Sequence, residues 1–309
     1  MAELKSDVRN IVGTTTITEL KIPVPWGHIA AKTWGDSSCF PILCLHGEVD
    51  NAATFDRLIP LLPQQFYYMS IDLPGHGHSS HYLPGIPYKF IDYVAVLRRI
   101  VDHFSWAKIN ILGHDLGGLL GLFFAAVYPD KIMKLIVFDV IHPVLPRQHL
   151  INHIKLNNEH LLSIETDEAV PQVFSYQTLY EKLCSWRAKD SSVAAIDASI
   201  SRNAEQVADG SYLLTMDQRV RYINYPFFDD RQFHIILKNL RCELLIFTAK
   251  GIARNQNILP VTSLLYIFRY KCARFEHHII EGNCDIHLNF PTRLVPIMAS
   301  FLQEIRSSL

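Results

Sequence analysis

The sequence predicts an α/β fold in which a mostly parallel central sheet carries helices on both faces and an inserted helical cap. Short apolar runs alternate with segments of helical spacing, a pattern typical of parallel strands joined by crossover helices. Hydrophobic residues make up 49% of the 309 residues and charged residues 19%, which allows a large buried core. The formal net charge is −1 without a basic stripe or polybasic run, so we expect no nucleic acid partner.

Each expected element follows from its local pattern. Strands are short apolar runs that end at glycine or at turn residues, and helices show an apolar residue every three or four positions. The expected strands are 40–47, 66–77 with its turn-rich end, 109–118 with its glycine-flanked turn, 134–140, 242–251 and 277–282. The expected helices are 88–104, 119–129, which ends at Pro129, and 293–305.

The pattern changes after Pro143, where residues 144–230 become richer in polar and helical segments and lack a strong strand. We therefore expect a core formed by residues 1–143 and 231–309, with residues 144–230 inserted as a helical cap. Ligands of such sheets bind at the carboxyl ends of the strands, so the cap would cover the site.

Targeting signals are weak. The charged N-terminus has no apolar stretch of a secretory signal, and no apolar run reaches the length of a membrane span, so we expect a cytoplasmic protein. The six cysteines form no CxxC pair and are expected to be reduced core thiols. The C-terminal Ser-Ser-Leu only loosely resembles a peroxisomal Ser-Lys-Leu address. We expect neither a cofactor nor a metal.

One glycine-rich segment carries the functional argument. Gly113-His114-Asp115-Leu116-Gly117 fits the pattern G-x-nucleophile-x-G between a predicted strand and a predicted helix. This turn is so tight that side chains at the flanking glycines would clash. The helix that follows points its N–H groups at the same space and favours an anion there. Asp115 is thus the candidate nucleophile.

Two further signals support this site. His46-Gly47 ends an earlier strand, and the backbone N–H groups of Glu48 and Leu116 are expected to form an oxyanion hole. His287 lies between the last strand and the last helix, where the catalytic base of this architecture is found. The other histidines, including His76, are expected on loops or at the surface.

Together these signals resemble the α/β-hydrolase superfamily over nearly the whole chain. The segments 46–63, 66–88 and 214–219 look closer to the serine hydrolase-like (kraken-type) family of animals. That family normally has serine at the elbow, where this chain has Asp115. Epoxide hydrolases and haloalkane dehalogenases use an elbow aspartate, but Val49 stands where epoxide hydrolases have proline, and Leu116 where dehalogenases have tryptophan.

An elbow aspartate suits particular chemistry. A carboxylate can attack an sp³ carbon, and a histidine-activated water then hydrolyses the alkyl ester. Attack on an ordinary ester would give a reactive anhydride instead. We therefore expect a hydrolase for a small apolar epoxide or alkyl halide. The alternatives are a catalytically impaired relative that binds a small ligand and an ester hydrolase as in the wider family.

The remaining roles stay open. Residues 251–257, the common place for the acid partner of the histidine, contain no Asp or Glu. Asp139 is the alternative acid, and Asp285 is expected to be a loop carboxylate. Proton donors to the leaving oxygen of an epoxide are typically cap tyrosines, and the predicted cap offers Tyr176, Tyr180, Tyr212, Tyr222 and Tyr225.

Overall fold

The computed structural model describes residues 10–12, 15–139, 150–167, 173–186, 192–207, 209–226, 228–250 and 258–304. The Ser-Ser-Leu terminus and residues 251–257 lie outside these ranges. None of the helices in the described part of the chain has the length and apolar character of a membrane span.

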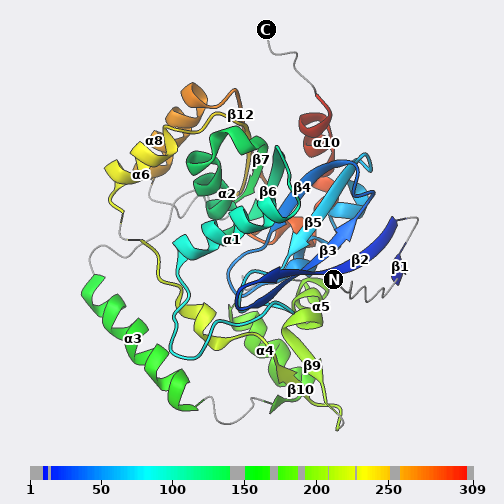
Figure 1. The fold of residues 1–309 in the computed structure, drawn as a ribbon, viewed down its shortest axis with the longest axis vertical. Helices are drawn as coiled ribbons and strands as arrows, with labels where there is room; N and C mark the ends of the chain where they lie inside the picture. The colour runs from blue at the N-terminus through cyan, green and yellow to red at the C-terminus, as the bar shows by residue number, and fades with distance from the viewer. Residues whose placement is uncertain are drawn as a thin grey trace.

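Nine of the described strands form one sheet that runs through the molecule (Figure 1). Neighbouring strands from β5 to β12 pair in parallel, and β1, β2, β3 and β5 pair antiparallel. In spatial order the strands are β1 (Asn10–Val12), β2 (Thr15–Val24), β3 (Gly27–Trp34), β5 (Phe66–Ile71), β4 (Phe40–Leu45), β6 (Ile109–His114), β7 (Ile132–Phe138), β11 (Glu243–Ala249) and β12 (Arg274–Ile280). The predicted mostly parallel sheet is confirmed, and the three N-terminal strands extend it.

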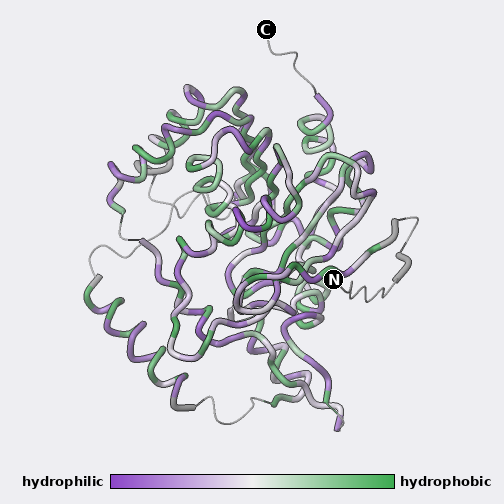
Figure 2. Tube along the Cα trace, in the orientation of Figure 1, coloured by the Kyte–Doolittle hydropathy of each residue, from purple (hydrophilic) through white to green (hydrophobic). Residues whose placement is uncertain are grey.

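The central strands are buried on both faces, as their continuous apolar runs require. In β4, Leu43 and Leu45 pack into the core that includes side chains of α1 and α2, whereas Ile42 and Cys44 pack into the core that includes α10. Figure 2 shows the hydrophobic residues along α2 and the neighbouring strands. Two apolar layers therefore hold the strand ends in place.

Helices and short helical turns fill the connections. The three predicted helices correspond to α1 (Phe90–His103), α2 (Leu116–Val127) and α10 (Val295–Gln303). Three further helices were not expected from the sequence: α6 (Asp230–Leu237), α8 (Ile258–Lys271) and α9 (Ile286–Asn289). The 3₁₀ turns outside the proposed cap are η1 (Ala52–Phe55), η2 (Ile59–Leu61), η3 (Pro129–Lys131) and η6 (Pro291–Arg293).

The segment proposed as a cap lies between β7 and α6. Its described elements are α3 (Leu150–Asp167), β8 (Val173–Phe174), α4 (Tyr176–Trp186), α5 (Val193–Asn203), β9 (Ala204–Gln206), β10 (Tyr212–Leu214) and η5 (Gln218–Tyr222). The strands β8, β10 and β9 form a small antiparallel sheet. Such short, half-exposed strands leave no apolar run in the sequence, which is why none was expected there. The domain boundaries themselves stay a prediction.

Buried polar contacts tie α5 to the loops after β4 and β5. Asn51 Nδ2 donates to the Ser199 carbonyl at 2.8 Å. Arg202 donates to Asp72, with 2.6 Å between Nη2 and Oδ2, and both side chains are buried. Since Asp72 Oδ1 also accepts from Ala52 N–H at 2.7 Å, one carboxylate joins α5 to both loops.

Candidate active site

The elbow forms where β6 ends at His114 and α2 begins at Leu116. Asp115 between them has φ 49° and ψ −117°, a strained conformation for a residue with a side chain. A Cβ on Gly117 would lie 2.1 Å from the Leu45 carbonyl oxygen, and one on Gly113 would lie 2.4 Å from the Gly117 carbonyl oxygen. Only glycine fits at either position, and the close approach of backbones sets the direction of the Asp115 side chain.

The Asp115 carboxylate contacts the loop that follows β4. Glu48 N–H donates to Asp115 Oδ2 at 3.0 Å. Leu116, whose N–H was the other expected donor, is the buried first residue of α2. Next to the donor, Val49 has φ 53°, a left-handed conformation that a β-branched residue rarely adopts. One carboxylate oxygen thus occupies the place where an oxyanion would be stabilised.

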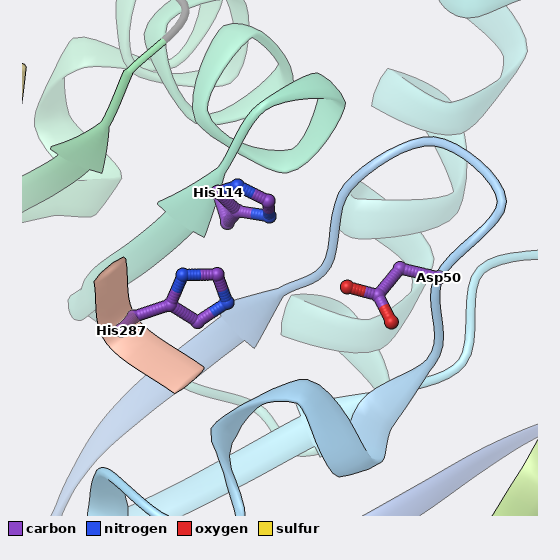
Figure 3. Close-up of side chains that lie close together, drawn as sticks. All are labelled: Asp50, His114 and His287. Atoms are coloured by element: carbon purple, nitrogen blue, oxygen red, sulfur yellow. The ribbon is translucent and has the colours of Figure 1, made fainter. Parts of the chain in front are cut away.

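His287 lies on α9, fully buried beside His114 (Figure 3). Its ring centroid is 4.1 Å from that of His114, and its ring stacks on Phe138 at 5.5 Å. Its Nε2 is 2.8 Å from Thr54 Oγ1. The hydroxyl and the two neighbouring rings therefore hold the imidazole in place.

His114 lies against both His287 and Asp115. A Cβ built on Gly47 would meet His114 Nδ1 at 2.9 Å and Asp115 Oδ2 at 3.1 Å, so both atoms surround the same small space. His114 Nε2 is 3.1 Å from the Cys284 carbonyl oxygen. Because a carbonyl only accepts, Nε2 is the donor, and in the neutral imidazole Nδ1 then has the lone pair.

Asp139 comes directly after β7 and has φ 69°. Its Oδ1 accepts from Ala249 N–H at 2.7 Å, while no hydrogen-bond donor of the described residues reaches its buried Oδ2. Burial raises the pKa of Asp139 to about 7, and the charges of Asp115 and Asp285 add to this rise, whereas His114 opposes it. The proposed acid is thus a buried carboxyl that resists ionisation. Asp285 is buried as well, at the start of α9.

Glu48 and Tyr225 are two further polar groups that interact electrostatically with Asp115. Burial raises the pKa of Glu48 to about 8, and the charge of Asp115 adds to it. Burial also raises the pKa of Tyr225 well above its usual value, and both Glu48 and Asp115 contribute. Among the tyrosines of the proposed cap, Tyr225 is therefore the one whose pKa is raised by the charge of Asp115. By contrast, Tyr176 donates to Asp197 at the surface and Tyr222 stacks on His160.

Several of these residues were not anticipated. Only the backbone of Glu48 was expected at the site, and neither Thr54, which contacts His287, nor Asp50, which lies close to His114 and His287, belongs to a recognised motif. Their closeness to His46-Gly47 was the one available signal. His76 lies on a loop, as expected, but it is fully buried, with its ring 4.8 Å from that of His46.

Comparisons with known proteins agree with this architecture. A family model described as "alpha/beta hydrolase fold" matches residues 41–177. Human serine hydrolase-like protein 2 is 37% identical over 298 residues, which is 93% of this chain and 94% of that protein. The crystal structure of a hypothetical protein from Pseudomonas aeruginosa matches with a TM-score of 0.78 at 22% identity, covering 93% of this chain and 99% of that one. That likeness shows the fold alone.

A shorter similarity concerns epoxide hydrolases. Mouse epoxide hydrolase 4 is 29% identical over 112 residues, which is 36% of this chain and 31% of that protein. The similarity covers too little of either chain to assign a reaction.

Proposed function

Because the chain belongs to the serine hydrolase-like family of α/β-hydrolase-fold proteins, we propose that it is a hydrolase with Asp115 as nucleophile and His287 as base. Its proposed substrates are small apolar epoxides or alkyl halides. The observation that carries the proposal is the 3.0 Å hydrogen bond from Glu48 N–H to Asp115 Oδ2. It orients the carboxylate so that its second oxygen can attack carbon.

In the first proposed step, an Asp115 oxygen attacks an sp³ carbon of the substrate. The new C–O bond makes an alkyl ester, and the carbon–oxygen bond of the epoxide or the carbon–halogen bond breaks. A halide leaves as the anion, whereas an epoxide oxygen needs a proton. Glu48 can supply it, since its pKa near 8 keeps it protonated at neutral pH, and the Tyr225 hydroxyl is the alternative donor.

In the second proposed step, His287 takes a proton from water as the water oxygen attacks the ester carbonyl of Asp115. The charge that develops on Oδ2 is stabilised by Glu48 N–H, the group that already contacts this atom. Collapse of the intermediate breaks the bond between the acyl carbon and the alkyl oxygen, and the imidazolium of His287 gives its proton to that leaving oxygen, which releases the alcohol. The acid left on Asp115 loses its proton, to Glu48 if Glu48 donated one in the first step and otherwise to solvent, and this restores the carboxylate. Asp139, which follows the Phe138 ring stacked on His287, is the proposed partner of the imidazolium.

A second candidate is a ligand-binding protein without turnover. The observation that favours it is the contact between His287 Nε2 and Thr54 Oγ1, which would have to break or shift before His287 could accept a proton from water at that nitrogen. In this case the buried site would still bind a small apolar molecule, but no ester would form on Asp115.

The test is covalent labelling of Asp115. The wild-type protein is incubated with panels of epoxides and 1-haloalkanes in heavy-oxygen water, and the peptide that contains Asp115 is analysed by mass spectrometry. Turnover should place one heavy oxygen in that carboxylate. His287→Gln should accumulate the alkyl ester as a stable mass increase, because the first step needs no base.

Asp115→Asn is the matched control and should show neither label nor adduct. Turnover without label in Asp115 would exclude the mechanism. Binding of a panel member without turnover or adduct would favour the ligand-binding alternative. Asp115→Ser restores the nucleophile usual in the family, so ester hydrolysis that is stronger in the wild type than in this variant would favour an esterase.

A further inference from the structure

Three potential metal ligands from distant parts of the chain meet beside the elbow (Figure 3). Asp50 lies in the loop after β4, His114 ends β6, and His287 lies on α9. One ligand atom of each lies within 4.8 Å of the others. The side chains are 2%, 5% and 0% exposed, so the cluster is part of the interior and not a solvated surface group.

The hydrogen bonding of His114 prepares it as a ligand. Its Nε2–H donates to the Cys284 carbonyl at 3.1 Å, and Nδ1 is buried without a hydrogen-bond partner among the described residues. Metal-binding histidines usually donate their second ring N–H to a carbonyl or carboxylate, which sets the tautomer and orients the ring. A buried lone pair without a donor is unfavourable, and a cation would satisfy it.

The donor set indicates which cation fits. Two imidazole nitrogens and one carboxylate oxygen match the three protein ligands of open zinc sites, which leave a fourth position for water. Mg²⁺ and Ca²⁺ prefer oxygen ligands throughout. Asp115 Oδ2 and His114 Nδ1 surround the same space next to Gly47. The carboxylate of Asp115 would therefore lie close to a cation bound by His114 and attract it.

The geometry needs only a small contraction. Zinc–ligand distances of about 2.0–2.1 Å place tetrahedral ligand atoms about 3.4 Å apart. The present limit of 4.8 Å exceeds this by about 1.4 Å, so the three side chains would have to close in on a bound ion.

We propose that Asp50, His114 and His287 form a binding site for a divalent transition metal, with Zn²⁺ as the best match, and that the bound ion inhibits the enzyme. Inhibition rests on the proposed function, because a His287 lone pair donated to a metal is not available to the water proton. Binding of the metal does not depend on that function. No metal site was expected from the sequence, in which the three residues are widely spaced and follow no ligand motif.

Direct binding tests the site without any substrate. Protein stripped with a chelator is titrated with Zn²⁺ in competition with a chromogenic chelator, and we expect one tight equivalent. His114→Asn keeps an amide donor for the Cys284 carbonyl but removes the imidazole. Loss of an outer-shell partner alone costs 10- to 100-fold in affinity, so we expect this variant to bind about 100-fold more weakly or worse. Asp50→Asn should also weaken binding.

Two controls distinguish Zn²⁺ binding at this site from binding by other histidines or by cysteines. His277→Asn removes a half-buried histidine of β12 and should leave Zn²⁺ affinity unchanged. Co²⁺ should give the visible spectrum of nitrogen and oxygen ligation. A thiolate charge-transfer band that is lost in Cys284→Ser would show that a cysteine holds the ion and would overturn the proposal, as would affinity unaffected by His114→Asn.

The inhibition is measured with a substrate whose turnover places heavy oxygen in Asp115. Zn²⁺ should suppress release of the alcohol in proportion to site occupancy, and each variant is compared with its own metal-free rate. Tight binding of Zn²⁺ without slower turnover would refute the inhibition, whereas the proposal of a metal site would stand. Absence of turnover in metal-free protein would count against the proposed function alone.

Discussion

Replacing Asp139 with asparagine removes a buried ionisable group and keeps an acceptor for Ala249 N–H. Asp139 is 1% exposed, and its pKa is raised from 3.8 to about 7. A raised carboxyl pKa means that the folded state holds the proton more tightly than the unfolded state does. The resulting stabilisation is complete below about pH 3.8 and is lost as the pH rises through about 7. At 1.36 kcal/mol per pKa unit the loss is about 4 kcal/mol.

Urea denaturation of wild type and Asp139→Asn at a series of pH values between 4 and 8 measures this directly. The free energy of unfolding of the wild type, minus that of the variant, should fall with rising pH by a few kcal/mol. Taking this difference cancels the contributions of all other titrating groups. Parallel curves for the two proteins would refute the reasoning that Asp139 is costly to ionise in the folded protein.

The same variant tests the role of Asp139 in turnover. If it orients His287 and stabilises the imidazolium, kcat should fall by up to about 10⁴-fold while alkylation of Asp115 continues. If it only organises the loop, turnover should persist near the wild-type rate. Comparing burst-phase alkylation with steady-state turnover distinguishes the two.

Three further predictions concern the glycines of the elbow, the buried ion pair between Arg202 of α5 and Asp72, and the proton donor. Gly117→Ala places a Cβ 2.1 Å from the Leu45 carbonyl and should abolish soluble expression, whereas Gly85→Ala, with open space and φ 77°, should cost about 1–2 kcal/mol in urea denaturation. Arg202→Met leaves the buried Asp72 without its cation and should lower the free energy of unfolding by about 3–5 kcal/mol, with Asp72→Asn in the same chain recovering part of it. If Glu48 donates the proton to an epoxide oxygen, the alkylation rate should fall above about pH 8 as Glu48 ionises. Glu48→Gln should lose this alkaline dependence, and a decline unchanged in that variant would point to Tyr225.

Part of the fold could be predicted because it depends on local chemistry. The parallel strands are short apolar runs buried on both faces, and the elbow is a glycine pattern imposed by backbone clashes. The N-terminal strands and the strands β8, β9 and β10 were missed for the converse reason. The residues of β8, β9 and β10 are half-exposed and too few to make a distinct apolar pattern, whereas in β3 the buried residues are interrupted by polar ones such as Lys32.

The sequence by itself determined the fold class, the strained turn at Asp115 and the proximity of Glu48 N–H to it, since all three follow from backbone sterics in a known strand–turn–helix arrangement. Only the tertiary structure decided that Asp50, His114 and His287 meet, because residues separated by 64 and 173 positions come together only when strands and loops assemble. It also decided the raised pKa values of Glu48 and Asp139. Those depend on how much water and charge surround a carboxyl, which is a property of the packed interior and not of the local sequence.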